Sequence, residues 1–175
     1  AREVITWTSN QLAEDELEYL NQLPEKARPD GADFLVVHAE IVEPMNFGYI
    51  LDQETAKANF AACDDRLIFI GHSHRAGYFV EDPNGEVCVC EPDDFHCEPE
   101  SRYIINPGSV GDPRSDEIVA SYAVYDDVTN DVYFQKCERH DQSNAPTAAA
   151  FATPSHSPLN VEQPPHTRSS PITSR

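Results

Sequence analysis

The sequence lacks several features that would place it in a particular class of protein. Its 175 residues contain no apolar run of about 18 residues, so we expect no transmembrane helix. No basic segment followed by an apolar one opens the chain, so we expect no signal peptide. Cysteines are few and odd in number, five in all, which favours a reduced, cytoplasmic protein over a disulfide-bonded secreted one.

Positive charge is also scarce. Lysine and arginine together number 12 against 31 acidic residues, and the formal net charge is −19. The charged residues after position 140 cancel one another, so the whole acidic excess lies in residues 1–140. Such a surface disfavours binding of nucleic-acid backbones and anionic membranes. A small phosphorylated substrate remains compatible with it, because a bound metal ion would dominate the local field.

The composition divides the chain into two parts. Residues 1–140 have the apolar patterning of one domain, whereas Ala, Pro, Ser and Thr dominate residues 141–175 without any periodicity. Such a segment buries too little apolar surface to offset its ordering entropy. We therefore expect a domain at 1–140 and a disordered tail at 141–175.

The order of the expected elements predicts an α/β fold. Leucines at spacings of three predict a helix over residues 1–23, and Asp52 is a good N-cap for a second helix over 53–63. Continuous apolar runs at 33–37 and 67–70 are typical of strands buried on both faces. Further strands are expected at 77–81 and 86–90, joined by a Pro-Asn-Gly turn, and at 103–105, 121–125 and 132–135.

Three histidines follow the two buried strands. His38 comes directly after the first strand, and His72 and His74 come after the second. If these strands are parallel neighbours joined by the 53–63 helix, their carboxyl ends lie side by side and the three imidazoles converge. Imidazole nitrogens bind divalent metals, so the pattern favours a metal site. Each histidine alone also fits a capping or core role.

Two other groups of residues admit alternative roles. Cys88 and Cys90, with His96 and Cys97, would make a small zinc site, although their spacing fits buried or unreactive thiols better. The aromatic residues of the segment 47–49 would line a substrate pocket near His38 or simply pack on the sheet.

Three segments resemble the calcineurin-like metallophosphoesterases, specifically their small bacterial-type branch. They are "FLVVHA" (34–39), "GHSH" (71–74) and "INPGSVGDPR" (105–114), within a resemblance that spans about residues 1–138. The resemblance implies a partial β sandwich flanked by helices and a site for two divalent metal ions, with Mn, Fe, Zn and Ni not distinguished. It also implies metal-dependent hydrolysis of a phosphomonoester or phosphodiester by a metal-bridged hydroxide.

The resemblance also implies roles for individual residues. His38 and His72 would bind one metal ion and His74 the other. Asn106 and Ser109 would support the histidines or their loop and, together with Arg114, are the candidate substrate-binding residues. Arg114 would contact the phosphate group, or alternatively form an ion pair with Asp112 or Asp116.

Several parts of the family pattern have no counterpart here. The family's Asp-x-His, Gly-Asp and Asn-His motifs lie upstream of the matched region; no Asp-x-His stands in that place, and Asn-His occurs nowhere. We therefore expect the C-terminal half of the domain, with no catalytic residue of its own and at most weak metal binding. The alternative is a catalytically inactive half-domain with an interaction or regulatory role. A half-domain would leave the edges of the strands at 34–37 and 67–70 exposed.

Overall fold

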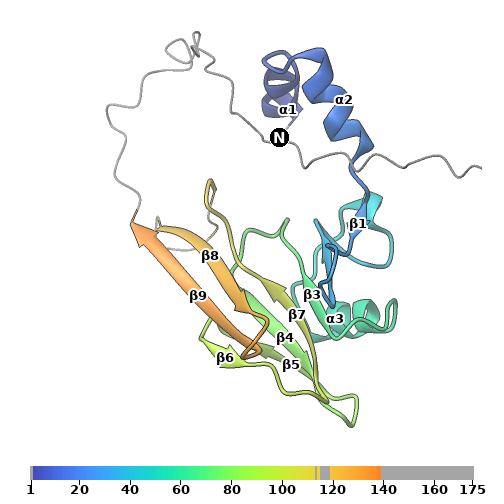
Figure 1. The fold of residues 1–175 in the computed structure, drawn as a ribbon, viewed down its shortest axis with the longest axis vertical. Coiled ribbons are helices and arrows are strands. Elements are labelled where there is room, and N and C mark those ends of the chain that lie inside the picture. Colours follow the sequence, from blue (N-terminus) through green and yellow to red (C-terminus); the bar gives the residue numbers. More distant parts are fainter. Residues whose placement is uncertain (1, 113, 115–118, 139–175) are drawn as a thin grey trace, which may run out of the picture. The chain divides into compact units, whose positions relative to one another are not determined.

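The computed structural model describes residues 2–112, 114 and 119–138 (Figure 1). All of them belong to the first of two compact units, Ala1–Arg139. Within this unit helices and strands mix as predicted, so the α/β class is confirmed. The expected tail at 141–175 falls outside the described residues. No helix in the described part of the chain is long and apolar enough to cross a membrane.

The first predicted helix is two helices, α1 (Arg2–Ser9) and α2 (Glu14–Gln22). The Ser9 hydroxyl donates to the Ile5 carbonyl oxygen at 3.0 Å, a side-chain bond that competes with continued helix. A new N-terminus forms at Ala13, whose backbone N–H donates to the Glu16 carboxylate at 2.7 Å. The spacing of the leucines did not predict this break between the two helices. The aromatic side chains of Trp7 on α1 and Tyr19 on α2 are 48% and 64% exposed.

A six-stranded sheet forms the centre of the unit, in the order β1-β2-β3-β7-β4-β5. Its strands are β1 (Lys26–Ala27), β2 (Phe34–Val37), β3 (Leu67–Phe69), β7 (Arg102–Asn106), β4 (Gly77–Glu81) and β5 (Val87–Cys90). The strands β2, β3 and β7 are parallel, which confirms the expected pairing of the two buried strands. The expectation that β2 and β3 have exposed edges is wrong, because β1 pairs with the outer side of β2 and β7 with that of β3.

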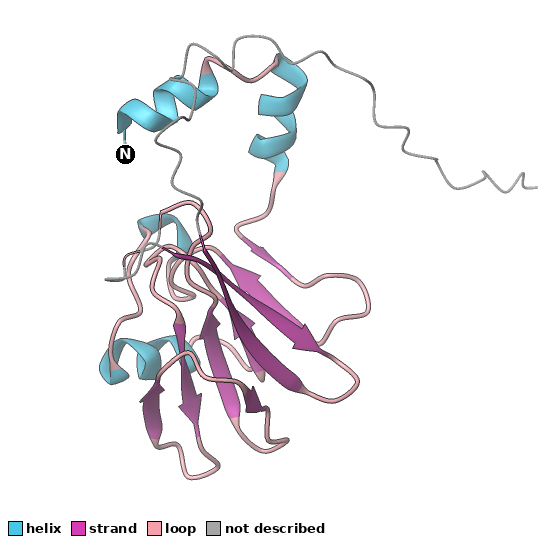
Figure 2. Ribbon diagram, turned by 90° about the vertical axis from the view of Figure 1, so that its left-hand side faces the viewer, coloured by secondary structure: helices cyan, strands magenta, loops and turns pink. Residues whose placement is uncertain are grey.

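A second sheet completes the sandwich (Figure 2). It has the order β6-β9-β8, from β6 (Phe95–His96), β9 (Asp131–Glu138) and β8 (Val119–Asp126). The acidic segment 91–100 thus contributes a short strand. Phe95 holds this strand against the first sheet, because its ring stacks on Tyr78 with centroids 3.9 Å apart.

Side chains alternate between two cores along the central strands. In β3, Ile68 joins the core that faces helix α3 (Gln53–Phe60), whereas Leu67 joins the core between the sheets. In β7, Ile104 and Ile105 divide in the same way. This period of two, with both faces apolar, is the reason for the continuous apolar runs in the sequence.

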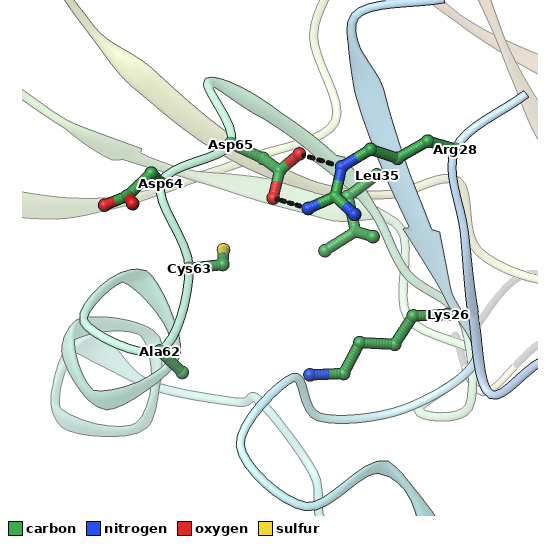
Figure 3. Close-up of a pocket in the computed structure, with 7 residues that line it drawn as sticks. All are labelled: Lys26, Arg28, Leu35, Ala62, Cys63, Asp64 and Asp65. Atoms are coloured by element: carbon green, nitrogen blue, oxygen red, sulfur yellow. Dashed lines mark hydrogen bonds and ion pairs between the residues drawn. The ribbon is translucent and has the colours of Figure 1, made fainter. Parts of the chain in front are cut away.

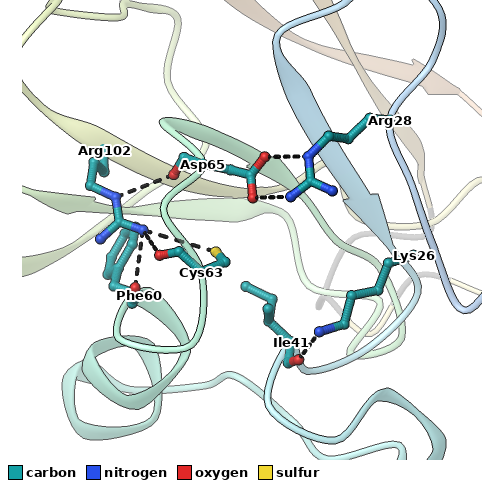
Figure 4. A network of polar contacts seen from close by, with 7 residues as sticks. All are labelled: Lys26, Arg28, Ile41, Phe60, Cys63, Asp65 and Arg102. Atoms are coloured by element: carbon teal, nitrogen blue, oxygen red, sulfur yellow. Dashed lines mark hydrogen bonds and ion pairs between the residues drawn. The ribbon is translucent and has the colours of Figure 1, made fainter.

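Helix α3 connects β2 to β3 and is fixed at both ends. Asp52 is its N-cap, and its carboxylate accepts a hydrogen bond from the Thr55 backbone N–H at 2.8 Å. At its C-terminal end, the guanidinium of Arg102 reaches from β7 to the carbonyl oxygens of Phe60 and Cys63 (Figure 4). The crossover is therefore tied to the sheet that it covers.

An ion pair joins the segment after β1 to the loop before β3. The Arg28 guanidinium donates two hydrogen bonds to the Asp65 carboxylate, at 2.8 and 2.7 Å (Figure 4). Hydrogen bonding to Arg28 is the main cause that lowers the pKa of Asp65. A carboxyl group with a lowered folded-state pKa stabilises the fold above its unfolded pKa of about 3.9. That contribution disappears as the pH falls through the folded-state pKa.

Replacing Arg28 by methionine should therefore lower stability at pH 7, and the difference from wild type should shrink at pH 3. The effect will be small, because the Arg28 side chain is 59% exposed and solvent screens the pair. Urea unfolding at both pH values, followed by circular dichroism, measures the free energy of unfolding of each protein. Lys57→Met, which removes an exposed cation on α3, is the control. Its difference in stability from wild type should not shrink between pH 7 and pH 3. A difference that stays constant with pH would contradict this account of Asp65.

Candidate metal centre

The three candidate histidines lie in loops at the carboxyl ends of β2 and β3. The two loops are joined by a hydrogen bond from the Gly71 backbone N–H to the His38 carbonyl oxygen at 3.0 Å. His72 and His74 have backbone φ angles of 61° and 59°, in the left-handed region that non-glycine residues seldom adopt. Such conformations cluster at functional sites, where the surrounding structure holds them in place.

His38 and His72 come together. Nε2 of His38 lies 3.3 Å from Nδ1 of His72, and the ring centroids are 5.2 Å apart. The nitrogen separation suits a hydrogen bond between neutral rings. It also equals the edge of about 3.3 Å expected between two ligands of one tetrahedral ion with bonds of about 2.0–2.1 Å. The pair therefore fits two positions around a single metal ion.

The surroundings favour the neutral form of His38. Partial burial is the main cause that lowers its pKa, and the neighbouring His72 and His74 lower it further. Neutral imidazole is the form that binds metals, because a protonated ring has no free lone pair.

His74 is not assembled with the other two. Its Nδ1 lies 2.7 Å from the carbonyl oxygen of Asp112 and 3.4 Å from the Asp112 carboxylate. Among the residues that the structure describes, no group of three or more His, Cys, Asp or Glu side chains is placed to hold a metal ion. The described residues therefore bring together one pair of candidate ligands, and metal binding by any of the three histidines stays a prediction.

Asn106 connects the two loops that follow β3 and β7. Its side chain is buried, and its Nδ2 donates to the Gly71 carbonyl oxygen at 2.7 Å and to the Ser73 hydroxyl at 2.9 Å. Its Oδ1 accepts a hydrogen bond from the Gly108 backbone N–H at 3.0 Å. In this position Asn106 supports the histidine loop and has no free donor to offer a substrate.

Ser109 and Arg114 lie farther along the same loop. The Ser109 hydroxyl accepts a hydrogen bond from the Asp112 backbone N–H at 3.0 Å, so Ser109 holds the segment that contacts His74. Arg114 donates from Nη1 to the Tyr49 hydroxyl at 3.4 Å. The alternative partner Asp112 forms no ion pair with it, and Asp116 falls outside the described residues. Contact of either residue with a phosphate group stays a prediction.

Two aromatic rings complete the surroundings of the histidine pair. Tyr49 stacks on His72, and Phe47 lies beside both His38 and His72. From the sequence, this aromatic segment would either line a pocket near His38 or pack on the sheet. In the structure both rings remain almost half exposed.

The cysteine and histidine group at 88–97 does not form a zinc site within the described residues. Cys97 is buried between the sheets, and this burial raises the pKa of its thiol to about 11. Cys88 is exposed on β5, and His96 pairs with Asp131 at 2.9 Å. Thiols kept protonated or far apart are poor metal ligands.

A separate pocket of about 550 Å³ lies between β1 and the loop after α3 (Figure 3). The cations that line it already have partners. Arg28 is bound to Asp65, and the Lys26 ammonium group donates to the Ile41 carbonyl oxygen at 2.5 Å. Both cations that line the pocket are therefore already engaged by groups of the protein.

Known proteins resemble this chain over most of the described residues. A solved metallophosphoesterase from Sphaerobacter thermophilus is 36% identical, with a TM-score of 0.68 over 77% of this chain and 56% of its own. A hypothetical protein from Pyrococcus horikoshii, 20% identical, shares the fold with a TM-score of 0.54 over 75% of this chain and 47% of its own. An uncharacterised protein from Methanocaldococcus jannaschii is 31% identical over 126 residues, which cover 70% of this chain and 49% of that protein.

The chain thus spans about half the length of the relatives that it matches. The family model that describes the calcineurin-like phosphoesterase superfamily domain matches residues 9–130. That range includes all three histidines, Asn106 and the loop that follows it. The chain belongs to the calcineurin-like phosphoesterase superfamily.

Proposed function

We propose that this chain contributes histidine ligands to a divalent-metal centre that hydrolyses a phosphomonoester or phosphodiester. The supporting observation is the approach of His38 and His72 to 3.3 Å at the carboxyl ends of two parallel strands. When bound, divalent ions in such centres neutralise the phosphate charge and lower the pKa of a bound water molecule. The remaining ligands would come from the part of the family domain that lies outside the match to this chain.

The described residues would hold this half of the centre in place. His38 and His72 would bind one ion, and Asn106 would fix the loop that carries His72. His74 would bind a second ion once it turns from Asp112. The described residues hold no complete ligand set, so we propose weak metal binding and little or no hydrolysis by this chain alone.

A chimera tests the proposal. The residues that precede the matched region in the Sphaerobacter thermophilus metallophosphoesterase would be fused to the N-terminus of this chain. The chimera should hydrolyse a generic aryl phosphodiester in the presence of Mn²⁺, and the chain alone should hydrolyse it poorly. A chimera that folds and binds Mn²⁺ but hydrolyses no phosphoester would support the alternative, an inactive half-domain with a binding role.

In the chimera, His72→Ala should weaken Mn²⁺ binding by more than about tenfold, since even the loss of a residue that supports a ligand has an effect of this size. Isothermal titration calorimetry measures the affinity. His96→Ala is the matched control, because His96 pairs with Asp131 on the second sheet, and it should bind Mn²⁺ as the parent does. Equal binding by parent and His72→Ala would remove His72 from the metal centre.

A further inference from the structure

The rings of Phe47 and Tyr49 form an aromatic wall beside the histidine pair. Tyr49 is stacked on His72, with centroids 4.5 Å apart and planes at 22°. The Phe47 ring lies 5.8 Å from His72 and 6.3 Å from His38, measured between centroids. Phe47 and Tyr49 are nevertheless 47% and 44% exposed. Each ring therefore covers a histidine with part of its surface and presents the rest to solvent.

The backbone holds this wall in a conformation that packing on the sheet would not require. Phe47 has a φ angle of 53°, in the left-handed region that is costly for a bulky residue. The next residue is Gly48, and the carboxylate of Glu40 occupies the place where a Cβ atom would stand, so a larger residue here would displace that side chain. An exposed phenylalanine in a strained conformation is the kind of feature that functional sites retain.

A positive charge lies at the edge of the wall. The Arg114 guanidinium donates to the Tyr49 hydroxyl at 3.4 Å, and the ion pairs found in the described part of the chain do not include it. Arg114 is exposed, and the bond to Tyr49 uses one of the five N–H donors of its guanidinium. A planar apolar surface and a guanidinium thus lie side by side, next to the two histidines.

We propose that the aromatic wall binds the planar aromatic group of a phosphoester, while Arg114 and the histidine side of the site receive its phosphate. The inference rests on the proposed function, which it sharpens to aryl or nucleoside phosphates as the substrate class. Stacking on Phe47 supplies the preference for an aromatic group, because any planar π system can lie against its exposed face. An ester of an aliphatic alcohol or a simple sugar gains nothing from this surface.

Binding of three probes to the metal-free chain tests the inference without any need for turnover. The probes are adenosine 5′-monophosphate, phenyl phosphate and ribose 5-phosphate, and NMR titration gives the affinity of each. The two aromatic probes should bind about tenfold more tightly than ribose 5-phosphate, the effect of one aromatic stack. Preference for one of the two aromatic probes would decide between a nucleobase and a simple aryl group, and either preference supports the class.

Variants of Phe47 distinguish the effect of its ring on binding from the effect of the loop conformation. Phe47→Asn removes the ring but retains a residue that tolerates the left-handed region, and it should reduce the preference to less than about twofold. Phe47→Tyr should retain the preference, and so should Tyr19→Asn, which removes an exposed ring on α2.

Equal affinity for all three probes, binding of none, or an unchanged preference in Phe47→Asn would overturn the inference. Its failure is distinguishable from failure of the proposed function. If the chimera showed Mn²⁺-dependent hydrolysis but no preference for aromatic phosphates, only the proposed role of the aromatic wall would be wrong. If the chimera bound Mn²⁺ and preferred aromatic phosphates but hydrolysed no phosphoester, only the proposed catalytic function would be wrong.

Discussion

Replacement of Arg102 by methionine should destabilise the domain by about 3 kcal/mol, because one guanidinium holds three elements together. From β7, Arg102 donates to the Glu81 carboxylate on β4 at 2.8 Å and to the Asp65 carbonyl oxygen at 3.2 Å. It also binds the carbonyl oxygens of Phe60, the last residue of α3, and of Cys63 in the loop that follows (Figure 4). Its guanidinium lies 5.1 Å from the centre of the Phe60 ring. Methionine retains the unbranched apolar stem of the side chain but is shorter and makes none of these bonds.

The loss arises mainly from carbonyl groups left without a donor. The last carbonyl oxygens of a helix have no partner within it, and Arg102 supplies one in a part-buried position. An unpaired polar group in such a place loses its hydration without compensation. Lysine should recover only part of the stability, because a single ammonium group cannot reproduce the planar fork that reaches four acceptors.

Urea unfolding followed by circular dichroism measures these differences. Glu81→Gln is the matched control, since it retains an acceptor for Arg102 and removes only the charge, and it should have a distinctly smaller effect. If Arg102→Met were no more destabilising than Glu81→Gln, the ion pair rather than the carbonyl contacts would be the stabilising element.

The sequence could predict the parts of the fold that depend on local patterns. Apolar runs located β2, β3 and β7, and the Pro-Asn-Gly turn located the β4–β5 hairpin, where Gly85 has a φ angle of 81°. Placing His38 and His72 at the ends of parallel neighbours was enough to predict their approach. These features are fixed by residues close together in the chain, or by one rule about parallel strands.

Features decided by contacts between distant residues could not be predicted in this way. The strand β1 has two residues, and its pairing with β2 rather than any pattern of its own defines it. The orientation of His74 depends on Asp112, 38 positions away, and on a left-handed backbone that no local pattern indicated. The role of Arg102 likewise depends on acceptors from three other segments.

The other large effect is expected at Asn106, where replacement by leucine should cost about 3 kcal/mol. Leucine has a similar volume, so the core would lose little packing. It would leave the Gly71 carbonyl oxygen, the Ser73 hydroxyl and the Gly108 backbone N–H without their present partner. Asn106 is only 3% exposed, so water cannot readily replace the lost amide.

This substitution should also disturb the histidine pair, which a general loss of stability would not do. Asn106 binds the residues on both sides of His72, in a loop that includes two histidines with left-handed backbone conformations. We expect the imidazole resonances of His72 to shift in Asn106→Leu under conditions where the variant remains folded. Long-range ¹H–¹⁵N spectra of the histidine rings measure this effect.

Asn59→Leu is the matched control. Asn59 is also buried, 2% exposed, and its amide also bonds backbone groups, but these belong to Ile41 and Thr55. Both variants should lose comparable stability, while only Asn106→Leu should shift His72. If both shifted His72 equally, its position would depend on the stability of the domain as a whole. A shift confined to Asn106→Leu would show that one buried amide sets the geometry of the histidine pair.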